Sequence, residues 1–297
     1  NADIAGKVPN VRINSGMLIL RNRKELDTPY LYQFMKSQKG QNQISFMSFG
    51  SAQPQLTKKD MGNLEVVFPK EKEEQLRIST CLLQVDYLIT LHQRKCEQTK
   101  TLKKYMLQKM FPQNGEKVPE IRFAGFTDDW EQRKLGDISI EMLAGGDIDK
   151  EKIVEQGKYP VIANALTNEG IVGFYEHEYR VKAPAVTITG RGDVGHAKVR
   201  KVDFTPVVRL LAIRTNHDID FIENAINNLK VIVESTGVPQ LTVPQLRKWE
   251  LFIPPTIAEE RIIGAYLRQL DNLITLHQRK CDELQKIKKF MLQNMFV

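Results

Sequence analysis

The stretch Leu88-Ile-Thr-Leu-His-Gln-Arg-Lys-Cys96 occurs twice in this chain, because it returns unchanged as Leu273-Ile-Thr-Leu-His-Gln-Arg-Lys-Cys281. The second copy follows the first by 185 residues (277 − 92). The same offset relates Lys103-Lys-Tyr-Met-Leu-Gln-Lys-Met-Phe111 to Lys288-Lys-Phe-Met-Leu-Gln-Asn-Met-Phe296. A period of this length is far longer than that of a solenoid repeat. We therefore infer that a whole module has been duplicated, and that the chain consists of two related halves.

Each copy of the stretch lies inside a long helical pattern. Seam residues recur at alternating four- and three-residue steps from Ile78 to Met106, and again from Ile263 to Leu284. This spacing is typical of a coiled-coil heptad. A helix from about residue 73 to 110 would be nearly 60 Å long, at about 1.5 Å per residue, and a lone helix would leave its apolar stripe in water. We therefore expect the two long helices to pair with each other as an antiparallel coiled coil.

The bulk composition narrows the class of protein. The chain has 297 residues and a formal net charge of +7, which permits a polyanionic partner. Its three cysteines, Cys81, Cys96 and Cys281, lie in the helical patterns and are too few for a disulfide framework. No apolar run approaches the roughly 20 residues that span a bilayer, and no signal peptide is visible. We expect a cytoplasmic protein without a membrane partner.

The domain boundaries follow from the repeat. Residues 1–69 show a strand at 17–21, a short helix that begins after Asp27, a polar loop at 41–55 and a strand at 64–68. Met17–Arg21 corresponds to Leu210–Arg214, in the middle of the second globular domain, so we expect residues 1–69 to be only the C-terminal part of a first domain. The first long helix occupies 70–112, the complete second domain 113–255, and the second long helix 256–297. If the shortening is natural, self-association is expected.

The second domain is predicted to have an α+β fold. Short strand-like runs are found at residues 159–163, 170–175, 185–189, 197–202, 207–213 and 249–253. A helical pattern at about 219–229 interrupts them. Mixed short strands with few helices are typical of α+β domains.

The whole arrangement resembles a known family. The repeated elements are Pro-Gln-Leu-Thr at 54–57 and 239–242 and the long helix with its matching end, together with the lead-in Val118-Pro-Glu-Ile-Arg-Phe and Trp130-Glu-Gln-Arg-Lys-Leu-Gly136. They look like the DNA-specificity subunit of type I restriction-modification systems. The resemblance covers essentially the whole chain, and the departure is the missing front of the first target-recognition domain.

The resemblance implies a function and a set of partners. In that family, each target-recognition domain reads one half of a bipartite site in double-stranded DNA, and the paired helices set the distance between the halves. The subunit is not an enzyme. It recruits two adenine methyltransferase subunits and often two motor-nuclease subunits, so S-adenosylmethionine, ATP and Mg²⁺ are expected on those partners and no cofactor on this chain. The alternative from another class is a coiled-coil adaptor that binds protein and not DNA.

Three groups of residues are candidates for DNA contacts. The Gly-rich hairpin and the strand after it carry basic residues suited to phosphates and guanine, namely Arg191, Lys198, Arg200 and Lys201. A loop and its neighbouring strand carry amides and hydroxyls that could read base edges, namely Asn164, Thr167, Asn168, Tyr175 and Tyr179. The third group occurs in both halves, as Ser235, Thr236 and Gln240 and as Ser51, Gln53 and Gln55. For each residue, turn chemistry, packing or a solvated surface charge is the competing explanation.

Three other kinds of motif, for dinucleotide binding, zinc binding and catalysis, are weaker candidates than DNA recognition. Gly190-Arg-Gly-Asp-Val-Gly195 matches a dinucleotide-binding pattern, but that motif must open a helix, and the residues that follow alternate like a strand. His92, Cys96, His277 and Cys281 could form a Cys2His2 zinc set if the helices aligned them, although seam residues of this kind also fix helix register. We expect no metal. The sequence motifs of methyltransferases, P-loop ATPases and nucleases are absent, which argues against a stand-alone enzyme.

Overall fold

The computed structural model describes residues 17–21, 24–47, 56–113, 115–229 and 239–296. The chain forms two compact units, and each is described here by itself. Unit 1 consists of Asn1–Gln98 and Ile274–Val297, and unit 2 of Thr99–Leu273. The long helices α4 (Lys72–Lys109) and α8 (Ile257–Asn294) each contribute one end to unit 1 and the other to unit 2. Their bounds lie within three residues of the predicted helices at 70–112 and 256–297.

The main sheet of unit 2 has four antiparallel strands in the order β2-β8-β5-β6. They are β2 (Ser139–Ala144), β8 (Leu210–Thr215), β5 (Ala185–Thr189) and β6 (Ala197–Arg200). One face of the sheet packs on α6 (Ile219–Asn227), through residues such as Ile188, Ile213 and Phe221. The other face carries Ala185 and Ala212, which join Ile162 and Phe204 in a second cluster. Every residue of β5 is buried because both of its faces are covered.

Two smaller sheets complete unit 2. A three-stranded sheet has the order β4-β3-β7, from β4 (Ile171–Tyr175), β3 (Tyr159–Ile162) and β7 (Thr205–Pro206), with β3 and β7 parallel. A two-stranded sheet pairs β1 (Glu131–Lys134) with β9 (Glu250–Ile253). Short helices α5 (Leu135–Ile138) and α7 (Val243–Arg247) and the 3-10 turns η1 (Lys150–Lys152) and η2 (Thr167–Gly170) connect these elements. Mixed sheets with few helices confirm the predicted α+β class.

The lead-in to unit 2 is tied to the start of α8. Arg122 donates from Nε and Nη2 to the carboxylate of Glu259, at 2.7 and 2.9 Å, and the indole of Trp130 donates to the same carboxylate at 3.3 Å. Glu259 is fully buried, so its charge needs these partners. The next residue, Glu260, accepts from the backbone N–H of Asp218 at 2.9 Å. The acidic first turn of α8 therefore joins the helix to the domain.

Unit 1 contains α1 (Thr28–Lys36), α2 (Gln38–Met47) and α3 (Lys58–Gly62) beside its parts of α4 and α8. The helix α1 begins after Asp27, as predicted. Asp27 caps it, because its carboxylate accepts from the N–H of Tyr30, and Pro29 lies in the first turn. The core is formed by Tyr30, Phe34, Leu82 and Phe296.

Three sequence predictions for unit 1 are wrong. Residues 17–21 and 64–68 are not strands, since in the described part of unit 1 no strand lies beside them to complete their hydrogen bonds. Their counterparts β8 and β9 do have such neighbours, namely β2, β5 and β1. The first part of the predicted loop at 41–55 is the helix α2, which continues to Met47. Residues 48–55 lie outside the described residues.

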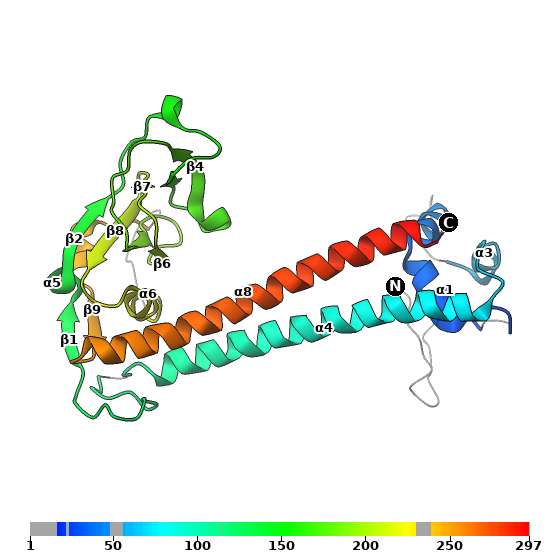
Figure 1. Cartoon of the computed structure of the whole chain (residues 1–297), viewed down its shortest axis with the longest axis horizontal. Helices are drawn as coiled ribbons and strands as arrows, with labels where there is room; N and C mark the ends of the chain where they lie inside the picture. Colours follow the sequence, from blue (N-terminus) through cyan, green and yellow to red (C-terminus); the bar gives the residue numbers. More distant parts are fainter. Residues whose placement is uncertain (1–16, 22–23, 48–55, 114, 230–238, 297) are drawn as a thin grey trace. The chain divides into compact units, whose positions relative to one another are not determined.

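The helices α4 and α8 lie side by side and run in opposite directions (Figure 1). One ion pair between them occurs in each unit. In unit 2, Lys103 Nζ lies 2.7 Å from the carboxylate of Asp271. In unit 1, Lys288 pairs with Asp86, and both members are displaced by 185 residues from the first pair. His92 contacts His277 with their Nδ1 atoms 3.0 Å apart, also at this separation. The contacts between the two helices in each unit therefore recur at the offset of the sequence repeat.

Candidate nucleic-acid interface

Four loops of unit 2 meet at one place, and we call them the loop cluster. They comprise residues 163–170, 190–196, 207–209 and 239–241. The backbone N–H of Leu241 donates to the carbonyl of Gly190 at 2.8 Å, and that of Gly192 to the carbonyl of Pro239 at 3.3 Å. A Cβ on Gly190 would lie 2.3 Å from the carbonyl oxygen of Arg209, so only glycine allows these loops to approach so closely.

Asn164 fastens two of these loops together. Its Nδ2 donates to the carbonyl of Arg191 at 2.9 Å, and its Oδ1 accepts from the N–H of Gly190 at 2.7 Å. Both ends of the amide are therefore engaged within the protein. Arg191 itself is exposed, and its backbone forms a bridge with Gln240. The structure thus gives Asn164 the geometry of a positioning residue and presents Arg191 to solvent.

The turn at 167–170 has an unusual backbone. Asn168 and Glu169 have positive φ values of 49° and 53°, which non-glycine residues rarely adopt. Asn168 Nδ2 donates to the carbonyl of Ile171 at 3.1 Å, so its side chain stabilises the turn, while Thr167 is exposed. A conformation of this kind persists only when its surroundings hold it, and such positions are common in binding loops.

Arg200 is the group that holds this turn. Its side chain is buried, and it donates from Nε to Thr187 Oγ1 at 3.0 Å and from Nη2 to the carbonyl of Glu169 at 2.9 Å. Burial lowers the pKa of Arg200, against the opposing charges of Glu169 and Glu223, yet a guanidinium stays protonated. In this structure the side chain faces the turn rather than solvent.

The other two basic candidates lie near carboxylates. Lys198 is exposed on β6. Burial raises the pKa of Glu223, and the positive charge of Lys198 opposes this shift. Lys201 Nζ lies 3.8 Å from Asp220, which also accepts from Arg268 at 2.6 Å. Lys198 and Lys201 therefore remain near the surface, with α6 supplying partial charge compensation.

The two tyrosines differ in exposure. Tyr175 is buried, and its hydroxyl accepts from the N–H of Asp149 at 2.9 Å and lies 3.2 Å from the carbonyl of the same residue. Tyr179 is exposed and lies with its ring centroid 5.0 Å from that of Tyr159. Exposed aromatic rings of this kind can contact bases or sugars, whereas Tyr175 fixes the segment around Asp149.

Sequence reasoning missed Arg209. It has a φ of 79°, lies in the loop cluster between β7 and β8, and donates to the side chain of Gln240. Only the strained backbone and the contact with Gln240 identify it, and neither is visible in the run Val-Val-Arg-Leu-Leu. The remaining candidates, Ser235, Thr236, Ser51, Gln53 and Gln55, lie outside the described residues.

The structure bears on two of the competing motifs. Gly190–Gly195 is followed by β6 and not by a helix, so it does not form a dinucleotide site. The thiol of Cys96 lies 3.8 Å from the carbonyl oxygen of Ile274 and 3.9 Å from Oε1 of Gln278. Among the residues that the structure describes, no group of three or more His, Cys, Asp or Glu could hold a metal. Within the same residues, no helix has the length and apolarity that crossing a bilayer requires.

Comparison with known proteins finds similarity to one protein family. The sequence profile described as "Type I restriction modification DNA specificity domain" matches residues 7–101 and 127–286. In Mycoplasma pneumoniae, "Putative type I specificity subunit S.MpnORF507P" is 26% identical over 261 residues, which span 86% of this chain and 67% of that relative. In the same organism, "Putative type I specificity subunit S.MpnORF89P" is 30% identical over 148 residues, or 48% of this chain and 43% of the relative. The crystal structure of an S subunit from M. genitalium superposes with a TM-score of 0.71 at 18% identity, over 92% of this chain and 73% of that one.

Proposed function

The chain belongs to the type I restriction-modification DNA specificity family, and from that membership we propose that it reads one half of a bipartite DNA site with unit 2. The curated relatives described above are longer than the matched parts. The activity of the whole protein is therefore part of the proposal. The observation that carries it is the loop cluster, in which polar side chains are displayed on a backbone fastened from several sides.

Within the loop cluster, Arg191 is proposed to read a base. It is exposed at the tip of a hairpin whose backbone is held by Asn164 and by the segment at 239–241. An arginine in this setting can donate two hydrogen bonds to guanine in the major groove. Thr167, in the loop cluster, and Tyr179 are also exposed. Lys198 and Lys201 would contact phosphates, which position the protein without specifying sequence.

The long helices are proposed to recruit two copies of one partner. In unit 2, Leu102 and Tyr105 of α4 are 40% and 47% exposed, and in unit 1 their repeat counterparts Ile287 and Phe290 of α8 are 45% and 66% exposed. Large exposed apolar side chains on both repeats suit protein contacts. Two related patches fit two methyltransferase subunits, as the family resemblance implies. S-adenosylmethionine would bind on those subunits, and ATP and Mg²⁺ on motor-nuclease subunits where these are present.

Methylome sequencing tests this proposal most directly. Cells would express the chain together with its methyltransferase, and adenine methylation should appear at one bipartite sequence. Arg191→Ala should relax the choice at one base position, at a cost of about 1–3 kcal/mol in discrimination. Lys248→Ala, which removes an exposed charge from the segment before β9, is the matched control and should leave the site unchanged.

Two results would contradict the proposal. An adaptor that binds only protein would give neither sequence-specific methylation nor salt-dependent duplex binding. A chain that methylates or cuts DNA alone, in the presence of S-adenosylmethionine, ATP and Mg²⁺, would be an enzyme in its own right. To assign such an activity to this chain and not to a contaminant, a point change within the chain must abolish it.

A further inference from the structure

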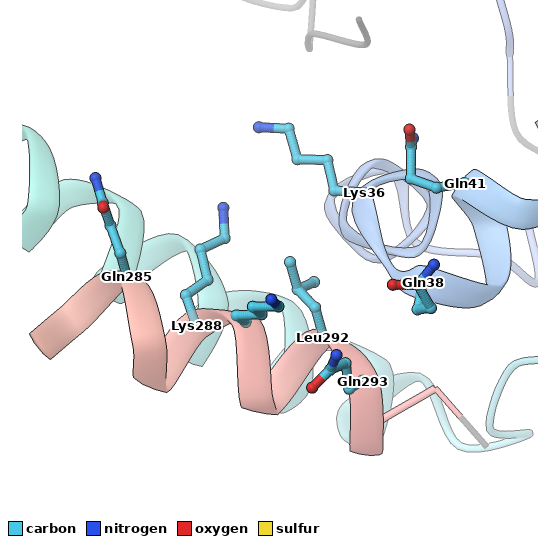
Figure 2. Close-up of a pocket in the computed structure, with 8 residues that line it drawn as sticks. Lys36, Gln38, Gln41, Gln285, Lys288, Leu292 and Gln293 are labelled. Carbon is cyan, nitrogen blue, oxygen red and sulfur yellow. The ribbon is translucent and has the colours of Figure 1, made fainter. Parts of the chain in front are cut away.

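Unit 1 contains an open hollow between α1, α2 and the last turns of α8 (Figure 2). Its volume is about 240 Å³. Lysines and glutamines dominate the lining, and Leu292 is the apolar member. None of the lining residues is acidic. In Figure 2 the side chains of Lys36 on α1 and Lys288 on α8 extend away from their helices in a similar direction.

The three lysines of the hollow, Lys36, Lys288 and Lys289, differ in how they are neutralised. Lys288 pairs with Asp86, which also accepts from the Nε2 of Gln33 at 3.1 Å, so this lysine is anchored to α4. Lys36 lies over the ring of Tyr32, with Nζ 4.1 Å from the ring centroid. Among the described residues, neither Lys36 nor Lys289 forms an ion pair with a carboxylate. The hollow therefore carries two uncompensated positive charges next to one that is fixed in place.

The corresponding place in unit 2 has a different charge. Lys103-Lys104 is the counterpart of Lys288-Lys289, and Lys103 pairs with Asp271 in the same manner. There, however, Glu223 on α6 lies close enough to Lys103 for their charges to interact. In contrast, α1 contains no acidic residue. The repeat retains the lysine pair, whereas the positive hollow in unit 1 depends on residues that α1 and α2 provide.

We infer that this hollow binds a phosphate of the DNA backbone, an inference that rests on the proposed function. Lysine ammonium groups supply charge. The amides of Gln38, Gln41 and Gln285 each donate one hydrogen bond within the protein, to Asn42, to the carbonyl of Met35 and to Cys281, and each keeps a second N–H that can donate to a phosphate oxygen. Lysine and glutamine are both common ligands of the backbone in protein–DNA complexes. Contacts of this kind carry no base information, so the hollow adds affinity and fixes the register of unit 1 on the duplex.

Salt-dependent binding of the full chain to a duplex of random sequence tests the inference. The variant Lys36→Gln/Lys289→Gln keeps the side chains long and helix-forming but removes both uncompensated charges. Loss of one phosphate contact should reduce the slope of log K against log salt by about 0.9 and weaken binding about 8-fold at 0.1 M salt. Fluorescence anisotropy between about 50 and 200 mM salt covers the useful range.

The matched control is Lys39→Gln/Lys280→Gln. It removes the same net charge, but Lys39 does not line the hollow and Lys280 lies nine residues before Lys289, on the opposite face of α8. Equal slopes for the two double variants would overturn the inference, because the effect would then reflect net charge alone. Unchanged DNA binding with loss of methyltransferase co-purification would mean that the hollow binds a protein. If the unaltered chain shows no salt-dependent duplex binding, the proposed function fails, and the hollow's role fails with it.

Discussion

Replacement of Phe296, which lies just after the end of α8, by alanine should lower the free energy of unfolding of unit 1 more than an exposed change near the end of α8. The Phe296 ring is 5% exposed and lies 5.2 Å from the ring of Tyr30 and 5.9 Å from that of Phe34, measured between centroids. Truncation of a buried phenylalanine costs about 3–5 kcal/mol, because the lost burial and the cavity add. Phe290 is the matched control. It lies six residues earlier and is 66% exposed, so its truncation should change the free energy of unfolding by no more than about 0.5 kcal/mol.

Hydrogen exchange measured by mass spectrometry shows which segments the Phe296→Ala change destabilises. Backbone amides of α1 should exchange more than about 100-fold faster in Phe296→Ala, since each 1.4 kcal/mol corresponds to a factor of about ten. Amides of β5 in unit 2 provide an internal reference and should be unchanged. Protection of α1 that is equal in Phe296→Ala and Phe290→Ala would refute the reasoning, as it would show that the end of α8 does not stabilise α1. Phe290→Ala should instead reduce co-purification with the methyltransferase.

Three further changes test other parts of the structure. Arg200→Gln should lower the free energy of unfolding by about 1–3 kcal/mol in denaturant titrations, because the turn carbonyl at Glu169 loses its donor; Lys198→Gln, an exposed change on the same strand, should have almost no effect. Burial, then His92 and Lys95, lower the pKa of His277, so below a pH of about 6.5 the unfolded chain binds more protons and stability falls as pH decreases; His277→Gln should flatten that part of the stability profile, and an unchanged profile would exclude this histidine as its source. Asn164→Ala should relax methylation at the base position that Arg191→Ala affects, and relaxation at a different position would mean that Asn164 reads a base itself.

The sequence was most informative where one physical requirement repeats along the chain. The heptad spacing defined α4 and α8, since a buried stripe on so long a helix constrains every third or fourth residue. Asp27 was identifiable as a cap because few residue types can accept from the free N–H groups of a first turn. Strands such as β5 were visible for a similar reason. Four of its five residues, at 186–189, are β-branched, which is typical of a strand.

Elements were missed or misplaced where tertiary partners decide the conformation. Glu131–Lys134 is exposed along its whole length, and only its pairing with β9 makes it a strand. Conversely, residues 64–68 have a strand-like sequence, but the described part of unit 1 offers them no partner strand. The site shows the same limit. Arg200 reads as a phosphate-binding residue, yet it is buried against a turn whose positive φ values cannot be inferred from the residues that form it.

The packing of Phe296 on Tyr30 has a consequence for how the chain is synthesised. Unit 2 is one uninterrupted segment, so its core can form as soon as residues 99–273 have left the ribosome. Unit 1 is closed by the end of α8 and the residues after it, which pack against α1 and α4. The apolar side chains of α1 and α4 therefore remain exposed to solvent while unit 2 is synthesised. The entropic cost of closing the long loop between α1 and the end of α8 grows only slowly with loop length. Exposed apolar surface of this kind is where aggregation begins. The segment that contains α1 is thus translated before unit 2 and completes its core only after unit 2.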